Sequence, residues 1–254
     1  MALSIAAIEL HPAVGAWFTG RDLSGRDPAV GQAGNLAHRR PHLPAELAAA
    51  RREVARHIGQ PADRWHLMRQ VHGTEVALVD ARTPVGAELR DVDAAVTLEV
   101  DRPLVVQVAD CVPVLFAGPR TIGVAHAGRA GVYLDVVSAT VDALTRLGDP
   151  PETIRAVIGP AIGGCCYEVP AQLQDQVTSR VPVARATTTW GTPSLDLPAA
   201  VVAQLTAAGV TDVDTGQTAC THGDHRWFSH RRDPTSGRQV GIVVRTGSAT
   251  GVAA

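Results

Sequence analysis

The sequence predicts a single α+β domain built around a mixed β-sheet. Short valine-rich segments cluster between residues 65 and 126, and amphipathic segments lie before and after that cluster. A doubly wound fold would instead alternate strands and helices regularly along the chain. The 254 residues, 45% of them apolar and 19% charged, are enough for one large core. No repeat or linker divides the chain, so we expect one domain over residues 1–254.

The predicted strands are short, rich in valine, and bounded by Gly, Pro or Asp. In chain order we expect strands over residues 65–71, 76–79, 94–98, 104–108, 112–116, 122–126, 213–217 and 240–245. The passage 158–164 predicts the end of a further strand followed by a glycine-rich turn. That turn fits neither a dinucleotide-binding motif nor a P-loop, so it is only a weak indication of a ligand-facing loop.

Four segments have the apolar spacing of helices: 44–58, 131–147, 170–180 and 197–208. In the second segment apolar residues recur near every 3.6 positions, and Gly148 follows as a stop signal. In the fourth segment Asp196 is a suitable N-cap, and Gly209 marks the end.

The charge balance excludes several classes of function. The 23 basic and 25 acidic residues give a formal net charge of −2, so no strong field favours nucleic acid or an anionic membrane. Every basic residue in that count is arginine. The absence of lysine excludes Schiff-base chemistry and a P-loop lysine.

The apolar stretches and the cysteines indicate in which cellular compartment the protein is expected. The longest apolar stretch, residues 103–118, is interrupted by Gln107 and Asp110 and falls short of the roughly 20 apolar residues that a membrane helix needs. The N-terminal segment lacks the basic region of a signal peptide. Four cysteines, two of them adjacent, form no obvious disulfide framework. We therefore expect a reduced, cytoplasmic protein, and a monomer, since no long apolar stripe demands a partner.

Three passages place a reactive side chain where an apolar strand ends. His72 follows Gln70-Val71, Cys111 follows Ala109-Asp110, and His126 follows Val124-Ala125. Imidazole and thiolate are ligands that zinc prefers, and three protein ligands leave one open position, as in catalytic zinc sites. The long spacing does not compel a shared metal. The alternative is unrelated structural roles as buried thiol or core histidine.

Two further passages have weaker indications of chemistry. The segment Cys220-Thr221-His222-Gly223-Asp224-His225 holds four candidate ligands, although histidines in such loops are usually just solvated. Trp227 to Asp233 sets aromatic side chains beside Arg231 and Arg232. An aromatic face with a guanidinium suits a base and a phosphate, and the alternative is a salt-bridged surface turn.

Taken together, the passages resemble the YfiH-like family, also named a laccase or multicopper polyphenol oxidase domain. Members are described as purine nucleoside phosphorylases and as a peptidoglycan editing factor. The similarity runs from about residue 18 to 244. It rests on FTGR, QVHGTEV, DAAVT, ADCVPVLF, GVAHAG, IGPAIGGCCYEV, the Asp196-Leu197 helix start and CTHGDHRWFSHRRDPTSGR, in that order.

The resemblance implies a mixed sandwich flanked by helices and a zinc site of His72, Cys111 and His126. It implies phosphorolysis of adenosine, inosine, guanosine or methylthioadenosine with phosphate, together with adenosine deamination. With no lysine present, arginines must bind the anion. Our candidates for phosphate or sugar contact are Arg51, Arg129 and Arg231.

The chain departs from the family pattern at three places. Where the family commonly continues its HAG motif with Trp-Arg-Gly, this chain has Arg129-Ala130-Gly131. Ala50-Arg51 stands for an Asn-Arg pair, and the basic segment 38–42 replaces an acidic one. The three metal-type residues are unchanged, so a metal site is still expected, and the changes bear on substrate range and rate.

Three other functions fit the same residues. One is a copper-dependent polyphenol oxidase, which the lack of any His-x-His pair disfavours. Another is a cysteine amide hydrolase acting on peptidoglycan precursors. In it Cys111 would be the nucleophile, His126 or His72 the base, and Asp110 or Gln70 the residue that orients the base. The third is a zinc- or nucleotide-binding module without turnover, which the altered segment after His126 would explain.

Overall fold

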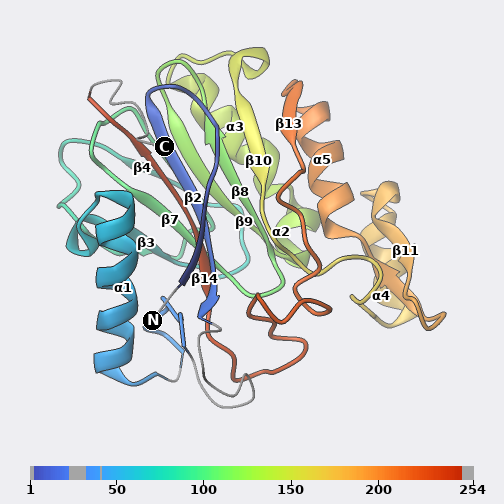
Figure 1. The fold of residues 1–254 in the computed structure, drawn as a ribbon. Coiled ribbons are helices and arrows are strands. Elements are labelled where there is room, and N and C mark those ends of the chain that lie inside the picture. Colours follow the sequence, from blue (N-terminus) through green and yellow to red (C-terminus); the bar gives the residue numbers. More distant parts are fainter. Residues whose placement is uncertain (1–2, 23–32, 41, 248–254) are drawn as a thin grey trace.

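The computed structural model describes residues 3–22, 33–40 and 42–247, and two six-stranded sheets pack face to face within them (Figure 1). The first sheet has the order β1-β2-β14-β7-β3-β5: Leu3–Ala7, Val14–Asp22, Gln239–Arg245, Leu104–Val108, His66–Arg69 and Leu89–Arg90. The second has the order β13-β10-β8-β9-β6-β4: Asp212–Asp214, Arg155–Ile158, Val112–Ala117, Ile122–Ala127, Ala94–Thr97 and Val76–Val79. Both sheets are mixed, since β3 pairs parallel with β7, and β4 with β6, among mostly antiparallel neighbours.

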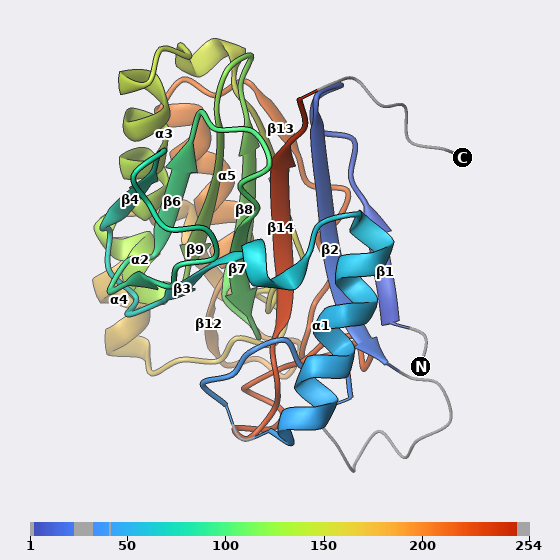
Figure 2. The same ribbon diagram turned by 90° about the vertical axis from the view of Figure 1, so that its left-hand side faces the viewer.

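Helices cover both outer faces of the sandwich, which gives four layers (Figure 2). Helix α1 (Pro44–Ile58) lies on the first sheet, whereas α2 (Arg129–Leu134), α3 (Val136–Arg146), α4 (Ala171–Thr178) and α5 (Leu197–Ala207) belong to the side of the second. A short ribbon of β11 (Arg185–Thr187) and β12 (Pro193–Leu195) lies beside α4. No helix in the described ranges is long and apolar enough to span a membrane.

Three apolar clusters hold the layers together. The central one lies between the sheets and includes Phe18, Leu104 and Leu115, all almost fully buried. A larger cluster packs the second sheet against α3 and α5, and a smaller one packs α1 against the first sheet. The burial of large apolar side chains at these three contacts is the main stabilising term of the fold. The predicted mixed sandwich flanked by helices is confirmed.

Helix α1 has the predicted bounds, 44–58, because Pro44 suits the first turn and Gly59 closes the last one in the left-handed region. The prediction of one continuous helix over 131–147 is wrong. Asp135 adopts φ +68°, which ends α2, and its carboxylate then caps α3 by accepting from the Ser138 amide. The apolar spacing therefore continues across a break that a single capping aspartate produces.

Strands β1 and β2 lie outside the predicted set, whereas β10 ends at Ile158, where the passage 158–164 predicted the end of a strand. The first two are poor in β-branched residues, and β2 contains Gly15 and Gly20, which lower strand propensity. The predicted strand 65–71 is reduced to His66–Arg69. Its end is fixed by Gln70, whose side-chain amide both donates to and accepts from the backbone of Gln107 on β7.

Candidate metal centre

The fold brings His72, Cys111 and His126 together at one edge of the sandwich. His72 follows β3 of the first sheet, Cys111 lies where the chain crosses from β7 to β8, and His126 is on β9 of the second sheet. Their ligand atoms all lie within 4.8 Å of one another. The Cys111 sulfur is 3.7 Å from Nε2 of His72, and the two imidazoles meet edge to face with centroids 4.7 Å apart. The group could therefore hold a metal ion.

The backbone around these side chains is specialised. His72 adopts φ +65° and Asp110 adopts φ +88°, both in the left-handed region that non-glycine residues rarely enter. Gly128, just after β9, has no side chain, and the side chains of His72 and Cys111 occupy the space beside it. A Cβ there would lie 2.6 Å from Cδ2 of His72 and 3.0 Å from the Cys111 sulfur. Only glycine fits at that position without moving a ligand.

A buried carboxylate, Asp93, connects two of the three side chains. Its oxygens accept from the backbone amides of Val71 (3.0 Å), His72 (2.9 Å) and Gly73 (2.7 Å). Oδ1 also lies 2.7 Å from Nδ1 of His126. A carboxylate only accepts, so Nδ1 of His126 carries the proton and Nε2 is left to bind a metal, the usual support of a metal-binding histidine. Asp93 thus fixes both the turn that presents His72 and the orientation of His126.

Asp93 stands in the DAAVT passage, but the sequence analysis gave it no role. An aspartate before a strand is common in any sequence. Its importance depends on the pairing of β6 with β9, which sets it against His126. Burial alone would raise the pKa of this carboxyl, but the hydrogen bonds from His126 and Gly73 hold that pKa below its ordinary value.

Charge stabilisation favours the thiolate of Cys111. Burial would raise its pKa, but His126 and His72 beside it lower that pKa to about 6. Burial would likewise lower the pKa of His126, whereas the facing Cys111 and Asp93 raise it to about 9. A thiolate is the form that binds metal and attacks carbonyl carbon, so the electrostatics suit either role.

The donor set matches a catalytic zinc site in kind. Two imidazoles and one thiolate are typical zinc ligands, and three ligands leave one tetrahedral position for water or substrate. The same His₂Cys set also occurs in trigonal copper sites. Among the residues that the structure describes, this group contains two histidines, far fewer than a cluster of several coppers would need.

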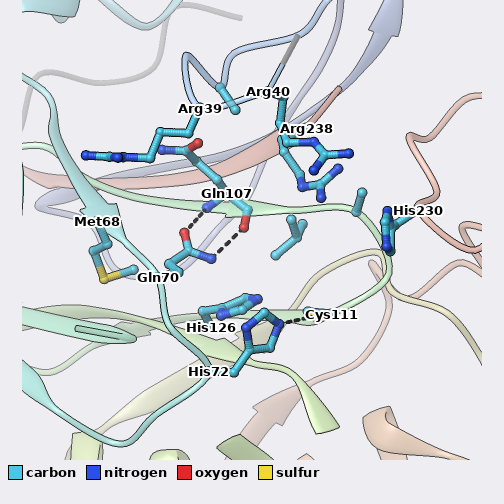
Figure 3. A pocket seen from close by; sticks show the side chains of 13 residues that line it. Arg39, Arg40, Met68, Gln70, His72, Gln107, Cys111, His126, His230 and Arg238 are labelled. Carbon is cyan, nitrogen blue, oxygen red and sulfur yellow. Dashed lines mark hydrogen bonds between the residues drawn. The ribbon is translucent and has the colours of Figure 1, made fainter. Parts of the chain in front are cut away.

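A cavity of about 400 Å³ opens above the three side chains (Figure 3). Arg39, Arg40 and Arg238 line the wall opposite His72 and His126, and we call this cavity the arginine pocket. Arg39 is paired with Glu88, whereas the carboxylate pairs between described residues include neither Arg40 nor Arg238. The Nε atom of Arg40 is buried without a hydrogen-bond partner. These cationic groups suit an anion.

A second cavity of about 400 Å³ lies on another side of His72 and Cys111. We call it the tyrosine pocket, because the Tyr167 ring lies in its wall with the guanidinium of Arg231 5.0 Å from the ring centroid. The other lining residues combine apolar and polar groups: Ala109, Asp110, Arg129, Ala130, Ile162, Leu197 and His230. His72, Cys111 and His230 line both pockets, so the pockets meet at two of the three metal-type side chains.

The sequence-predicted arginines divide between two places. Arg129 and Arg231 line the tyrosine pocket, and Asp110 fixes the latter by accepting from its backbone amide at 2.6 Å. Arg51 lines neither pocket. Its guanidinium donates to the carbonyl of Leu36 at 2.9 Å and so supports the loop that carries Arg39 and Arg40. Those two arginines, with Arg238 and His230, were not selected from the sequence, although the unusual basic segment 38–42 was a signal.

The candidate metal ligands of the segment 220–225 do not come together as the sequence suggested. Cys220 groups with Cys165 and Cys166, and the group includes none of the polar residues that follow Cys220. Asp224 instead pairs with Arg226. Nearby, Arg232 donates to three backbone carbonyls. Within the passage 227–233, His230 and Arg231 line the pockets.

Comparison with known proteins gives consistent matches. The family model described as multi-copper polyphenol oxidoreductase laccase matches residues 15–246. The chain is 46% identical over 204 residues to a Streptomyces griseus protein named purine nucleoside phosphorylase ORF3, covering 79% of this chain and 82% of that one. A Mycobacterium tuberculosis protein, also named purine nucleoside phosphorylase, is 43% identical over 203 residues, covering 79% and 80%.

Two solved structures share the fold. YfiH of Bacillus licheniformis superposes with a TM-score of 0.84 at 29% identity, covering 96% of this chain and 97% of that one. YlmD of Geobacillus stearothermophilus gives 0.81 at 29% identity, covering 92% of each. The chain therefore belongs to the multi-copper polyphenol oxidoreductase laccase family, also known as the YfiH-like family.

Proposed function

We propose that this protein is a zinc-dependent purine nucleoside phosphorylase. The observation that carries the proposal is the position of a three-donor centre where a cationic pocket and an aromatic pocket meet. Phosphorolysis needs an anion and a nucleoside held side by side, and the two cavities provide one place for each. The names of the Streptomyces and Mycobacterium relatives support the same activity.

His72, Cys111 and His126 are the proposed zinc ligands. When bound, zinc supplies a Lewis-acid position for a substrate or water oxygen. The set suits zinc through its borderline ligands and its open position. Copper remains the competing metal, since a lone copper would accept the same donors.

The arginine pocket is the proposed phosphate site. Arg40 and Arg238 are close enough for the charge of Arg40 to lower the pKa of Arg238, after the larger effect of burial. Two neighbouring cations without a carboxylate partner among the described residues favour a bound anion between them. Arg39 is at the outer side of the same wall and is partly neutralised by Glu88.

The tyrosine pocket is the proposed nucleoside site. The Tyr167 ring with Ile162 and Leu197 offers an aromatic and apolar surface of the kind on which a purine stacks. Arg129 and Arg231 stay our candidates for contact with the sugar or phosphate. Both guanidiniums lie beside the tyrosine, and their charges act against the burial that raises its pKa.

The reaction then runs between the pockets. A phosphate oxygen held by Arg40 and Arg238 forms a bond to the anomeric carbon of the sugar, and the bond from that carbon to the purine nitrogen breaks. The purine leaves with the electron pair and takes up a proton. His230 lines both cavities, and in its protonated form it is our candidate donor for that proton.

One observation favours a second candidate, the cysteine amide hydrolase. Cys111, His126 and Asp93 form a series in which a thiolate faces an imidazole that a buried carboxylate orients. This is the arrangement of a cysteine nucleophile with its base and orienting group. Zinc bound to the same sulfur would block that nucleophile, so the two functions exclude each other at this centre.

The test is an assay with purified, untagged protein. Adenosine and inosine are incubated with and without phosphate, and free base and sugar phosphate are separated by chromatography. We expect phosphate-dependent base release that a chelator abolishes and that Cys111→Ala lacks. Conversion of adenosine to inosine without phosphate measures the deamination that the resemblance implies. If the protein hydrolyses muropeptide amides, does so equally well with a chelator present, and releases no purine base, the hydrolase is favoured instead. If it binds these ligands without turnover, the non-catalytic module is favoured.

A further inference from the structure

A second group of metal-type side chains lies apart from the centre described above. Cys165 and Cys166 follow the glycine-rich turn after β10, and Cys220 comes from the loop after β13. The sulfur of Cys165 is 3.3 Å from that of Cys166 and 3.5 Å from that of Cys220, and all three lie within 4.8 Å of one another. We propose that these three cysteines bind a thiophilic closed-shell cation, Zn²⁺ or Cu⁺.

The backbone holds the two loops in register independently of the cysteines. Ala161 and Cys220 form a parallel bridge, in which the amide of Ala161 donates to Ala219 at 3.1 Å and that of Thr221 to Ala161 at 3.0 Å. The carbonyl of Gly163 accepts from the amide of Cys166 at 3.0 Å, which closes the turn. The sulfurs therefore converge on a preformed scaffold, so little conformational entropy is lost when an ion binds.

The spacing of the sulfurs is close to that of metal thiolates. Two sulfurs at about 2.3 Å from zinc and at the tetrahedral angle are about 3.8 Å apart. The 3.3 and 3.5 Å separations reach this value if each side chain moves outward by a few tenths of an ångström. Gly163 leaves room on one side, since a Cβ there would lie 3.3 Å from the Cys165 sulfur.

One of the three sulfurs is also held by the backbone. The amide of Gly163 donates to the Cys220 sulfur at 3.4 Å, which helps to keep that sulfur in the group. All three residues are half-buried, so an ion has access.

The donor chemistry selects the class of metal. Three soft thiolates without a carboxylate or imidazole in the group disfavour Mg²⁺, Ca²⁺ and Mn²⁺. Three sulfurs complete a trigonal Cu⁺ site, and with one solvent ligand they complete a tetrahedral Zn²⁺ site. A bound ion would join the loop after β10 to the loop after β13. Since Ile162 and Tyr167 of that first loop line the tyrosine pocket, the ion would be a structural support for its wall.

The test uses Cys111→Ala as the starting protein, because that change removes a ligand of the other centre. The protein is stripped of metal, kept reduced under anaerobic conditions with a phosphine, and titrated separately with Zn²⁺ and with Cu⁺ against a chromophoric chelator. We expect about one ion per chain with a Kd well below 1 μM for at least one of the two metals. Adding Cys220→Ser or Cys166→Ser should weaken that binding at least 100-fold.

Several results would overturn the proposal. One is the lack of tight binding of either metal to Cys111→Ala. Another is unchanged binding after both serine substitutions, in proteins that circular dichroism shows to be folded. Intact mass two daltons below the reduced value in anaerobically purified protein would indicate a disulfide within the chain instead. Co²⁺ serves as an independent probe, since sulfur-to-cobalt charge-transfer absorption should appear in Cys111→Ala and disappear in Cys111→Ala/Cys220→Ser. Its persistence would place the ion elsewhere.

Discussion

Asp93→Asn is the most informative single substitution, because this side chain supports two proposed ligands at once. In the wild type Oδ1 accepts from the His72 amide and from Nδ1 of His126, and Oδ2 accepts from the amides of Val71 and Gly73. An asparagine must replace one oxygen by an NH₂ group. Whichever way it is turned, two donors that are at least partly buried then face another donor.

The magnitude follows from that count. Each buried donor without an acceptor costs about 1–3 kcal/mol, so the free energy of unfolding should fall by about 2–6 kcal/mol. The histidine also loses the carboxylate that fixes its ring and proton, which for supporting residues typically weakens metal binding about 10–100-fold. Both effects should appear together, since one side chain causes both.

The assay is zinc affinity by chelator competition at a temperature well below the melting transition, with Tm measured in parallel. Asp91→Asn is the matched control. Asp91 is two residues away, exposed and paired with Arg69, so its substitution should leave zinc affinity unchanged. The reasoning would be refuted if Asp93→Asn kept wild-type zinc affinity and wild-type Tm, because the four hydrogen bonds would then have no bearing on the centre.

Three further substitutions test other parts of the account. Gly128→Ala should lower the zinc content per chain, because the new methyl group would displace His72. Gly247→Ala is the control, since a methyl group there meets open space and should leave the zinc content unchanged. Equal zinc content in the two variants would contradict the crowding argument. Arg238→Gln should raise KM for phosphate at least tenfold and change KM for inosine little, and a change confined to inosine would move the anion site elsewhere. Arg51→Gln should lower stability by about 1–2 kcal/mol in urea unfolding with little change in KM for phosphate, and the opposite pattern would return this residue to the binding site.

The sequence was most informative where local chemistry decides the structure. Helix α1 has its predicted bounds, and both of its ends are set by local residues, Pro44 and Gly59. The residues of the candidate metal centre were selected because soft ligands follow three apolar strands. Their convergence is a property of the fold, in which β7 and β8 belong to different sheets and Cys111 lies at the crossing between them.

The parts that could not be predicted depend on contacts between distant segments. Asp93 acquires its role only when β6 pairs with β9. The arginine pocket draws Arg40 and Arg238 from positions 198 residues apart (238 − 40), and no local pattern links them. Arg51 was chosen from a motif, but its side chain turns to the carbonyl of Leu36, which a motif does not reveal.

The most direct test of the central claim is metal reconstitution followed by turnover. The protein is stripped with a chelator, reloaded with zinc or with copper, and hypoxanthine release from inosine and phosphate is measured per bound ion, with Cys111→Ala in parallel. The account predicts that turnover rises in proportion to zinc at the centre, stays near zero for the stripped protein, and is absent in the variant. Undiminished phosphorolysis by stripped protein, or by Cys111→Ala, would contradict a zinc centre at His72, Cys111 and His126.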